Sequence, residues 1–336
     1  MFNNKTIFIT GGTGSFGKKF IEIVLKKYKP KKIIIYSRDE QKQFQCQQKW
    51  KGNKFLPVRY FIGDVRDLDR LSLAMQGVDI VIHAAALKHV DTAEYNPFEF
   101  IKTNILGAEN VINACFANNV KKVIALSTDK ASSPINLYGA TKLTSDKLFV
   151  SANNYKGNQD IRFSVVRYGN VMGSRGSLIP FYLDKKKEGV LPVTDKRMTR
   201  FNISLEKAVE FVLLCLKKMW GGEIFVPKIP SFRVIDVAKA ISPQLKLKFI
   251  GIRPGEKIHE EMISQNDAIN SIEFKNFYVI TPNSKFIGWD KKKYLRLNKL
   301  GKSCASEFTY NSKTNKKFLT IKELKKLIQK YISDTY

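Results

Sequence analysis

The stretch ITGGTGSFG, residues 9–17, constrains the fold of this chain more than any other. It follows the apolar, β-branched run at residues 6–10 and opens a helical pattern, so it lies at a strand–turn–helix junction. Its glycines have the spacing G-x-x-G-x-x-G, which permits a tight turn and a close approach of backbone N–H groups to a diphosphate. A mere turn is the alternative. We predict a dinucleotide site; the residues expected at its phosphates are Gly11, Thr13, Gly14, Ser15, Phe16 and Gly17.

The remaining pattern predicts an α/β fold. Further apolar strands are expected at residues 32–36, 58–63, 78–85, 121–127 and 162–169, with helical stretches between them. Continuous apolar strands that alternate with helices indicate a doubly wound, parallel sheet of the Rossmann type. After Tyr168 this rhythm breaks, and a helix at 204–219 and a strand at 222–227 return to the first lobe.

Two interleaved lobes follow from this pattern. We assign residues 1–170 and 203–228 to an NADP-binding Rossmann domain, and residues 171–202 and 229–336 to a smaller substrate-binding lobe. The second lobe ends in an amphipathic helix that begins with a capping box, Thr320 and Glu323.

Composition narrows the class of partner. The net charge of +28 raises the question of nucleic acid, but 46 of the 58 basic residues are lysines spread along the chain, and no recognition motif is present. An anionic small substrate is the better interpretation. Four scattered cysteines indicate neither a disulfide framework nor a metal site, and no signal peptide or membrane span is expected, so we predict a cytoplasmic protein.

The second strand indicates which dinucleotide is bound. It ends in Ser37 and Arg38, ahead of the carboxylates Asp39 and Glu40. A hydroxyl and a guanidinium suit the 2′-phosphate of NADP; the alternative is that Arg38 only pairs with one of those carboxylates. Further along the cofactor, Asp64 and Val65 are expected beside the adenine, and Ala84, Ala85 and Ala86 where the backbone passes close to it.

The stretch STDKASSPINLYGATK, residues 127–142, carries the expected chemistry. Tyr138 and Lys142 share one helix face, and a nearby ammonium lowers the pKa of a phenol, which suits proton transfer. With Thr128, this is a hydride-transfer constellation. Asp129 and Lys130 add an acid and a base, which elimination of water from a 4-keto sugar requires. The alternative is a salt bridge that closes the strand end.

Together the motifs TGGTGSFG, YSRDE, HAAALKHV, STDKA, RYGNVMGSRGS, MTRFNISLE and RPGEKIHEEM resemble a known family. The chain is similar over nearly its whole length to the inverting UDP-N-acetylglucosamine 4,6-dehydratases of the extended short-chain dehydrogenase/reductase superfamily, and most to the flagellin-glycosylation branch. The resemblance implies a lyase that recycles bound NADP and makes UDP-2-acetamido-2,6-dideoxy-β-L-arabino-hexos-4-ulose for pseudaminic acid. It also implies a homo-oligomer, a hexamer or a dimer.

The resemblance also implies residue roles. Lys130 would be the base at C5 and Asp129 the acid for the C6 hydroxyl, with Lys142 orienting the cofactor ribose and Tyr138; whether Lys130 or Tyr138 reprotonates C5 stays open. The implied substrate contacts are Lys88 and His89 at the sugar, Asn170, Ser174 and Arg175 at the diphosphate, Arg200 at the hexose, and Arg253 and Glu256 at the nucleotide.

Other functions remain as alternatives. They are a retaining 4,6-dehydratase, a 4-epimerase, a related inverting enzyme for N-acetylfucosamine-type capsule sugars, and a non-catalytic NADP sensor. The Asp129–Lys130 pair argues against an epimerase, which needs no elimination, and a silent sensor would be expected to lose Tyr138 or Lys142.

Overall fold

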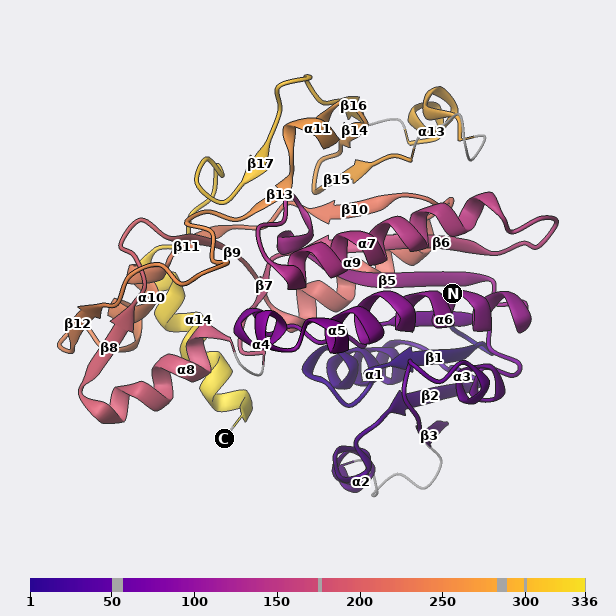
Figure 1. Ribbon diagram of the computed structural model, residues 1–336, viewed down its shortest axis with the longest axis horizontal. Helices are drawn as coiled ribbons and strands as arrows, with labels where there is room; N and C mark the ends of the chain where they lie inside the picture. Colours follow the sequence, from indigo (N-terminus) through magenta and orange to yellow (C-terminus); the bar gives the residue numbers. More distant parts are fainter. Residues whose placement is uncertain (50–56, 175–176, 283–288, 299–300, 336) are drawn as a thin grey trace.

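The computed structural model describes residues 1–49, 57–174, 177–282, 289–298 and 301–335. Its main feature is a ten-stranded sheet with the order β16-β14-β15-β10-β6-β5-β4-β1-β2-β3 (Figure 1). The strands β3, β2, β1, β4, β5, β6 and β10 run parallel to one another. Strands β14, β15 and β16 are added at one edge of the sheet and pair antiparallel. The predicted doubly wound Rossmann-type sheet is confirmed.

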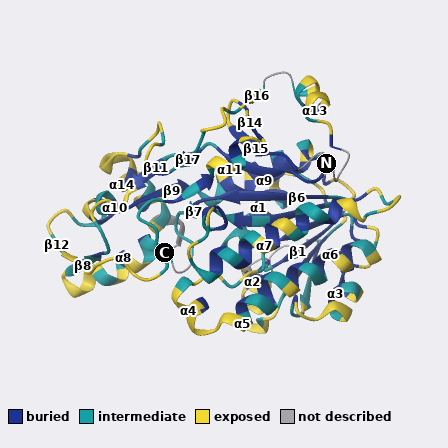
Figure 2. Cartoon of the chain, turned by 45° about the horizontal axis from the view of Figure 1, so that its top comes forward, coloured by how far each residue is buried: buried dark blue, intermediate teal, exposed yellow. Residues whose placement is uncertain are grey.

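Burial explains why the parallel strands read as continuous apolar runs. All five residues of β1 are buried, and so are all four of β4, because helices cover both faces of the sheet (Figure 2). The strands of the large sheet are β1 (Thr6–Thr10), β2 (Lys32–Ser37), β3 (Val58–Ile62), β4 (Ile80–His83), β5 (Lys122–Thr128), β6 (Arg162–Tyr168), β10 (Ile224–Pro227), β14 (Ser271–Glu273), β15 (Phe277–Ile280) and β16 (Lys302–Ser303).

Two layers of helices enclose the sheet. On one side α1 (Ser15–Lys27) packs against α9 (Leu205–Lys218), and the Lys19 ammonium lies 3.5 Å from the Glu206 carboxylate. On the other side α6 (Gly107–Ala117) packs between α3 (Leu68–Ala74) and α7 (Leu137–Ser151). Near these layers lie α2 (Glu40–Lys49), α4 (Val90–Tyr95), α5 (Pro97–Phe100) and α13 (Lys291–Leu297).

The second lobe has its own core. Apolar side chains from residues 179–198, 232–240 and 319–328 form a cluster separate from the main one, so the C-terminal helix belongs to this lobe. Its capping box is confirmed, because the Glu323 N–H donates to Thr320 Oγ1 and the Thr320 N–H donates to the Glu323 carboxylate. The elements are β7 (Asn170–Val171), α8 (Leu178–Lys185), β8 (Val190–Val193), β9 (Thr199–Ile203), β11 (Ser231–Arg233), α10 (Val234–Ile241), β12 (Lys246–Phe249), β13 (Glu261–Ile263), α11 (Gln265–Ala268), β17 (Tyr310–Asn311) and α14 (Ile321–Thr335).

One segment departs from the two-lobe assignment. Residues 271–280 and 302–303 contribute β14, β15 and β16 to the large sheet, although the sequence pattern places them with the substrate lobe. They join the sheet because β15 pairs with β10 along the edge opposite to β6. This pairing is antiparallel and needs no crossover helix. In the described part of the chain, every helix is too short or too polar to cross a bilayer.

Candidate active site

The glycine turn has the geometry of a diphosphate site. Gly11 has φ +65°, and a Cβ there would lie 2.9 Å from the Ala85 backbone nitrogen. A Cβ at Gly17 would lie 2.5 Å from Gly12 Cα, so α1 can approach β1 only through glycine. The N-cap of α1, Gly14, provides no side-chain cap, which leaves N–H groups of the first turn available to an anion.

This turn lines a cleft of about 630 Å³. Every predicted cofactor residue lines it: Gly11, Thr13, Gly14, Ser15, Phe16, Gly17, Ser37, Arg38, Asp64, Val65, Ala84, Ala85, Ala86, Tyr138 and Lys142. Thr10 Oγ1 holds one wall in place by accepting from the Ala84 and Ala85 N–H groups at 3.1 Å and bonding His83 Nδ1 at 2.9 Å. The residues present therefore fit a dinucleotide.

The end of β2 places a cation at this cleft. Arg38 Nη1 lies 3.5 Å from Asp64 Oδ2 and its side chain is half exposed. Asp39 pairs with Lys42, and Arg38 contacts Asp64. Although burial opposes it, hydrogen bonds from Arg66 hold the pKa of the Asp64 carboxyl below its usual range.

The predicted acid and base also line the cleft, in a short turn after β5. Asp129 Oδ1 accepts from Thr128 Oγ1 at 3.0 Å and from Lys130 Nζ at 3.1 Å. The Asp129 side chain is buried, and burial raises the pKa of its carboxyl even though Lys130 opposes the shift. This direction is the one that a general acid requires. Asp129 and Lys130 thus form the ion pair of our alternative reading and also line the cleft.

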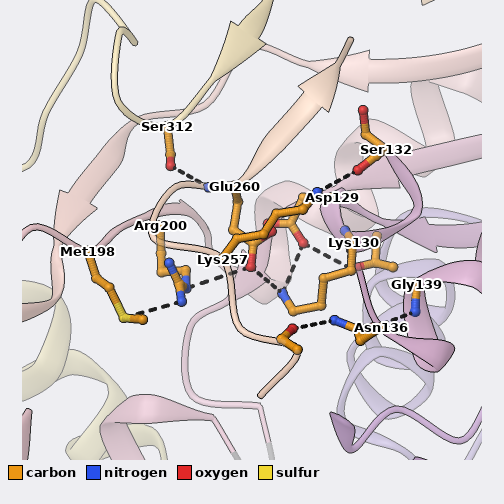
Figure 3. Close-up of polar contacts among 12 residues, drawn as sticks. Asp129, Lys130, Ser132, Asn136, Gly139, Met198, Arg200, Lys257, Glu260 and Ser312 are labelled. Atoms are coloured by element: carbon orange, nitrogen blue, oxygen red, sulfur yellow. Dashed lines mark hydrogen bonds and ion pairs between the residues drawn. The ribbon is translucent and has the colours of Figure 1, made fainter. Parts of the chain in front are cut away.

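A second carboxylate contacts the same ammonium and was missed by the sequence analysis. Glu260 Oε1 lies 3.2 Å from Lys130 Nζ and 3.8 Å from Arg200 Nε (Figure 3). Burial alone would lower the pKa of Lys130, but Asp129 and Glu260 outweigh it and the pKa is raised. The two carboxylates therefore favour the charged form of Lys130.

The predicted tyrosine also has a raised pKa. Burial raises the pKa of Tyr138 to about 12. The positive charge of Lys130 and a hydrogen bond with Thr128 oppose this rise. Lys142 instead donates from Nζ to the Leu126 carbonyl at 2.8 Å, and burial lowers the pKa of this amine. Desolvation of the phenolate is the largest influence on the pKa of Tyr138.

Four predicted substrate residues line the cleft: Lys88, His89, Asn170 and Ser174. Arg200 lies behind it and is nearly buried, with Nη1 donating to the Thr199 and Ile258 carbonyls. Arg253 lies apart from this cleft, 3.8 Å from Asp91, and Glu256 is on the same loop. Arg175 lies outside the described residues.

A buried amide also escaped the sequence analysis. Residues 101–106 form a π-helical turn between α5 and α6. In this turn Asn104 Oδ1 accepts from the Leu87 N–H at 2.9 Å, and Nδ2 donates to the Leu87 carbonyl and to Thr141 Oγ1. Asn104 thus fixes the loop that carries Lys88 against the helix that carries Tyr138. The only sequence signal was an asparagine within an apolar helical run.

Comparisons with known proteins agree with this architecture. The model of a family described as "Polysaccharide biosynthesis protein" matches residues 7–282. The chain is 58% identical, over 98% of both chains, to a UDP-N-acetylglucosamine 4,6-dehydratase (inverting) from Campylobacter jejuni. It is 39% identical to a UDP-glucose 4-epimerase from Rickettsia conorii, over 98% of this chain and 96% of the relative. The X-ray structure of Pen from Bacillus thuringiensis superposes with a TM-score of 0.88, at 38% identity and 98% coverage of both chains.

The sheet, the glycine turn and the Tyr138–Lys142 pair define a dinucleotide-dependent enzyme of the short-chain dehydrogenase/reductase class. Within that class, the chain belongs to the polysaccharide biosynthesis protein family, in the group of inverting UDP-N-acetylglucosamine 4,6-dehydratases, and is thus a lyase.

Proposed function

We propose that this protein is a UDP-N-acetylglucosamine 4,6-dehydratase that uses NADP and inverts C5. One observation carries the proposal: an acid–base pair, Asp129 and Lys130, lines the same cleft as Tyr138 and the glycine turn. The name and 58% identity of the Campylobacter jejuni relative support the substrate, and Arg38 at the end of β2 supports NADP. Bound NADP would accept a hydride from C4 and return it to C6.

The chain's own residues would move the protons. Tyr138 takes the proton of the C4 hydroxyl as that carbon is oxidised to a ketone, and Lys142 holds the ribose beside it. The ketone acidifies the C5 proton, which Lys130 removes while Asp129 protonates the C6 hydroxyl. The C6–O bond breaks, water leaves, and a C5=C6 double bond forms. Hydride addition at C6 and protonation of C5, by Lys130 or Tyr138, complete the keto-deoxy sugar.

The Asp129–Lys130 ion pair contains the number of protons that this scheme requires. A carboxylate beside an ammonium carries the same protons as a carboxylic acid beside an amine, so one transfer from Lys130 Nζ to a carboxylate in contact with it, Asp129 at 3.1 Å or Glu260 at 3.2 Å, gives a neutral amine. Elimination then consumes the proton of Asp129 and protonates Lys130.

The wider assignment is also proposed. We assign the product to pseudaminic acid synthesis for flagellin on the resemblance of MTRFNISLE and the C-terminal region to that branch. The four free cysteines, three of them buried, suit the reducing cytoplasm. A homo-oligomer and the substrate roles of Lys88, His89, Asn170 and Ser174 belong to the same proposal.

The test is incubation of the purified protein with UDP-N-acetylglucosamine in D₂O, without added cofactor, followed by NMR. A C6 methyl group, deuterium at C5 and L-arabino configuration are expected. Tyr138→Phe is the control, and its rate should fall by about 10²–10⁴-fold. A D-configured product would indicate a retaining enzyme. Epimerisation at C4 with C6 still hydroxylated would favour the epimerase alternative, which the Rickettsia conorii relative raises.

A further inference from the structure

The ammonium of Lys130 has two carboxylate partners where one would balance its charge. Its Nζ lies 3.1 Å from Asp129 Oδ1 and 3.2 Å from Glu260 Oε1, and Figure 3 shows it between them. Both carboxylates are buried, with side chains 1% and 3% exposed. Two adjacent buried carboxylates favour ionisation of only one, because their charges repel in a low dielectric. One of the two is therefore available to hold a proton.

Glu260 is fixed in place by the second lobe. Its backbone N–H donates to Ser312 Oγ at 2.9 Å, and the Ser312 N–H donates back to the Glu260 carbonyl at 2.7 Å. The next residue, Glu261, begins β13, which pairs with β17. The pairing of β13 with β17 thus holds the Glu260 carboxylate beside the turn at residues 129–131, although the two segments are more than 120 residues apart in the chain.

The surroundings decide which carboxylate is charged. The groups that act on the cluster are Lys130 and Asp129 from the turn, Tyr138 from α7, Arg200 from β9, Lys257 and Glu260 from the segment before β13, and Lys88 facing Lys130. The cations near Glu260, namely Lys130, Arg200 and Lys257, lower the pKa of its carboxyl although burial opposes them. Burial raises the pKa of Asp129, and the charge of Glu260 adds to that shift.

We propose that Glu260 is a positioning residue for dehydration: it is the counter-ion of Lys130 and takes up the ammonium proton when Lys130 acts as the base at C5, so Asp129 keeps the proton that the departing C6 hydroxyl takes up. This inference rests on the function proposed above. Without Glu260, Asp129 would be the remaining carboxylate in contact with Lys130 and would ionise. Oxidation at C4 uses Tyr138 and needs no proton from Asp129, so it should be largely independent of Glu260.

The first experiment compares Glu260→Gln, Glu260→Asp and wild type by the pH dependence of kcat for dehydration. Dehydration requires protonated Asp129 and falls as pH rises through its pKa, so the high-pH limb should move to lower pH by about one unit or more in Glu260→Gln. Glu260→Asp retains the charge and should restore the limb. Glu261→Gln is the matched control, since this neighbour contacts Ser133 at 3.1 Å, and it should leave the profile unchanged.

A single-turnover measurement separates the two chemical steps. In Glu260→Gln, reduced nicotinamide should accumulate after substrate is added, because C4 oxidation continues while elimination slows. A uniform loss of kcat at all pH values without this accumulation would show a merely structural role and overturn the proposal. A wild-type enzyme that leaves UDP-N-acetylglucosamine unchanged would instead refute the proposed function.

A measurement that needs no turnover distinguishes a failure of the Glu260 proposal from a failure of the proposed function. Difference infrared spectroscopy detects the protonated carboxyl of Asp129, assigned by its loss in Asp129→Asn. In the folded wild type this band should persist to higher pH than in Glu260→Gln. An identical titration in both proteins would refute the role of Glu260 whatever the substrate is.

Discussion

Removal of the buried guanidinium of Arg167 should cost more stability than any surface charge on the same strand. Arg167 lies on β6 with a side chain 2% exposed; its Nη2 is 3.2 Å from Asp146 Oδ2 on α7, and its Nη1 donates to the Met262 carbonyl at 3.0 Å. Arg167→Met would leave the Asp146 carboxylate buried without its cation. Loss of one partner of a buried pair costs about 3–5 kcal/mol, so we expect the free energy of unfolding to fall by that amount.

The assay is urea unfolding at neutral pH, followed by circular dichroism and tryptophan fluorescence, with coincident transitions as the test of two-state behaviour. Arg162→Met is the matched control on β6, because Arg162 makes a longer and exposed contact with Asp160, 3.6 Å, and should cost less than about 1 kcal/mol.

The double variant Arg167→Met with Asp146→Asn tests the cause. Neutralising the stranded carboxylate should recover about 2 kcal/mol relative to the sum of the single changes. A loss below about 1 kcal/mol for Arg167→Met, or strict additivity in the double variant, would refute the argument that charge burial dominates.

Three further outcomes follow from the cleft. Gly17→Ala should weaken NADP binding more than tenfold in calorimetry, because the new Cβ would lie 2.5 Å from Gly12 Cα; unchanged affinity would remove the turn from the cofactor site. Arg38→Gln, which also breaks the 3.5 Å contact with Asp64, should raise the Kd for NADP at least tenfold and the Kd for NAD by less than about threefold, whereas equal effects would contradict a contact with the 2′-phosphate. Burial lowers the pKa of His83 to about 3, so below pH 6.5 the unfolded chain binds a proton that the folded one excludes. Relative to His83→Gln, the wild type should therefore lose about 2 kcal/mol of unfolding free energy between pH 8 and pH 5, and parallel pH profiles would show that His83 does not carry this dependence.

The nucleotide-binding half of the fold is predictable from sequence because its signals are local. The first strand, predicted at residues 6–10, is observed at Thr6–Thr10, and the helix predicted at 204–219 is observed at Leu205–Lys218. Each has an apolar period and a clear end, such as the Ser204 cap that accepts from the Lys207 N–H. The glycine turn is equally local, since steric limits on the backbone specify the residue type.

The charge state of the catalytic cluster is not predictable in this way. The pattern Tyr138-x-x-x-Lys142 places two side chains on one helix face but does not show that Lys142 bonds the Leu126 carbonyl or that Tyr138 is desolvated. Glu260 lies in a run of charged residues that reads as a solvated strand start. Its burial depends on pairing between β13 and β17, and that pairing leaves no periodic signal in so short a strand.

Arg167, which forms the buried ion pair with Asp146, is also connected to the segments that carry Asp129 and Glu260. Arg167 bonds the carbonyl of Met262, two residues after Glu260, and β6 pairs with β5 in a register that places Arg167 opposite Ser127, two residues before Asp129. A single buried side chain therefore ties the end of the strand that carries the acid to the segment that carries its neighbouring carboxylate. Because the distance between the two carboxylates sets how strongly one raises the pKa of the other, the packing of Arg167 also affects the protonation of Asp129. The cost of burying that guanidinium is offset by its ion pair with Asp146 and its hydrogen bond to the Met262 carbonyl.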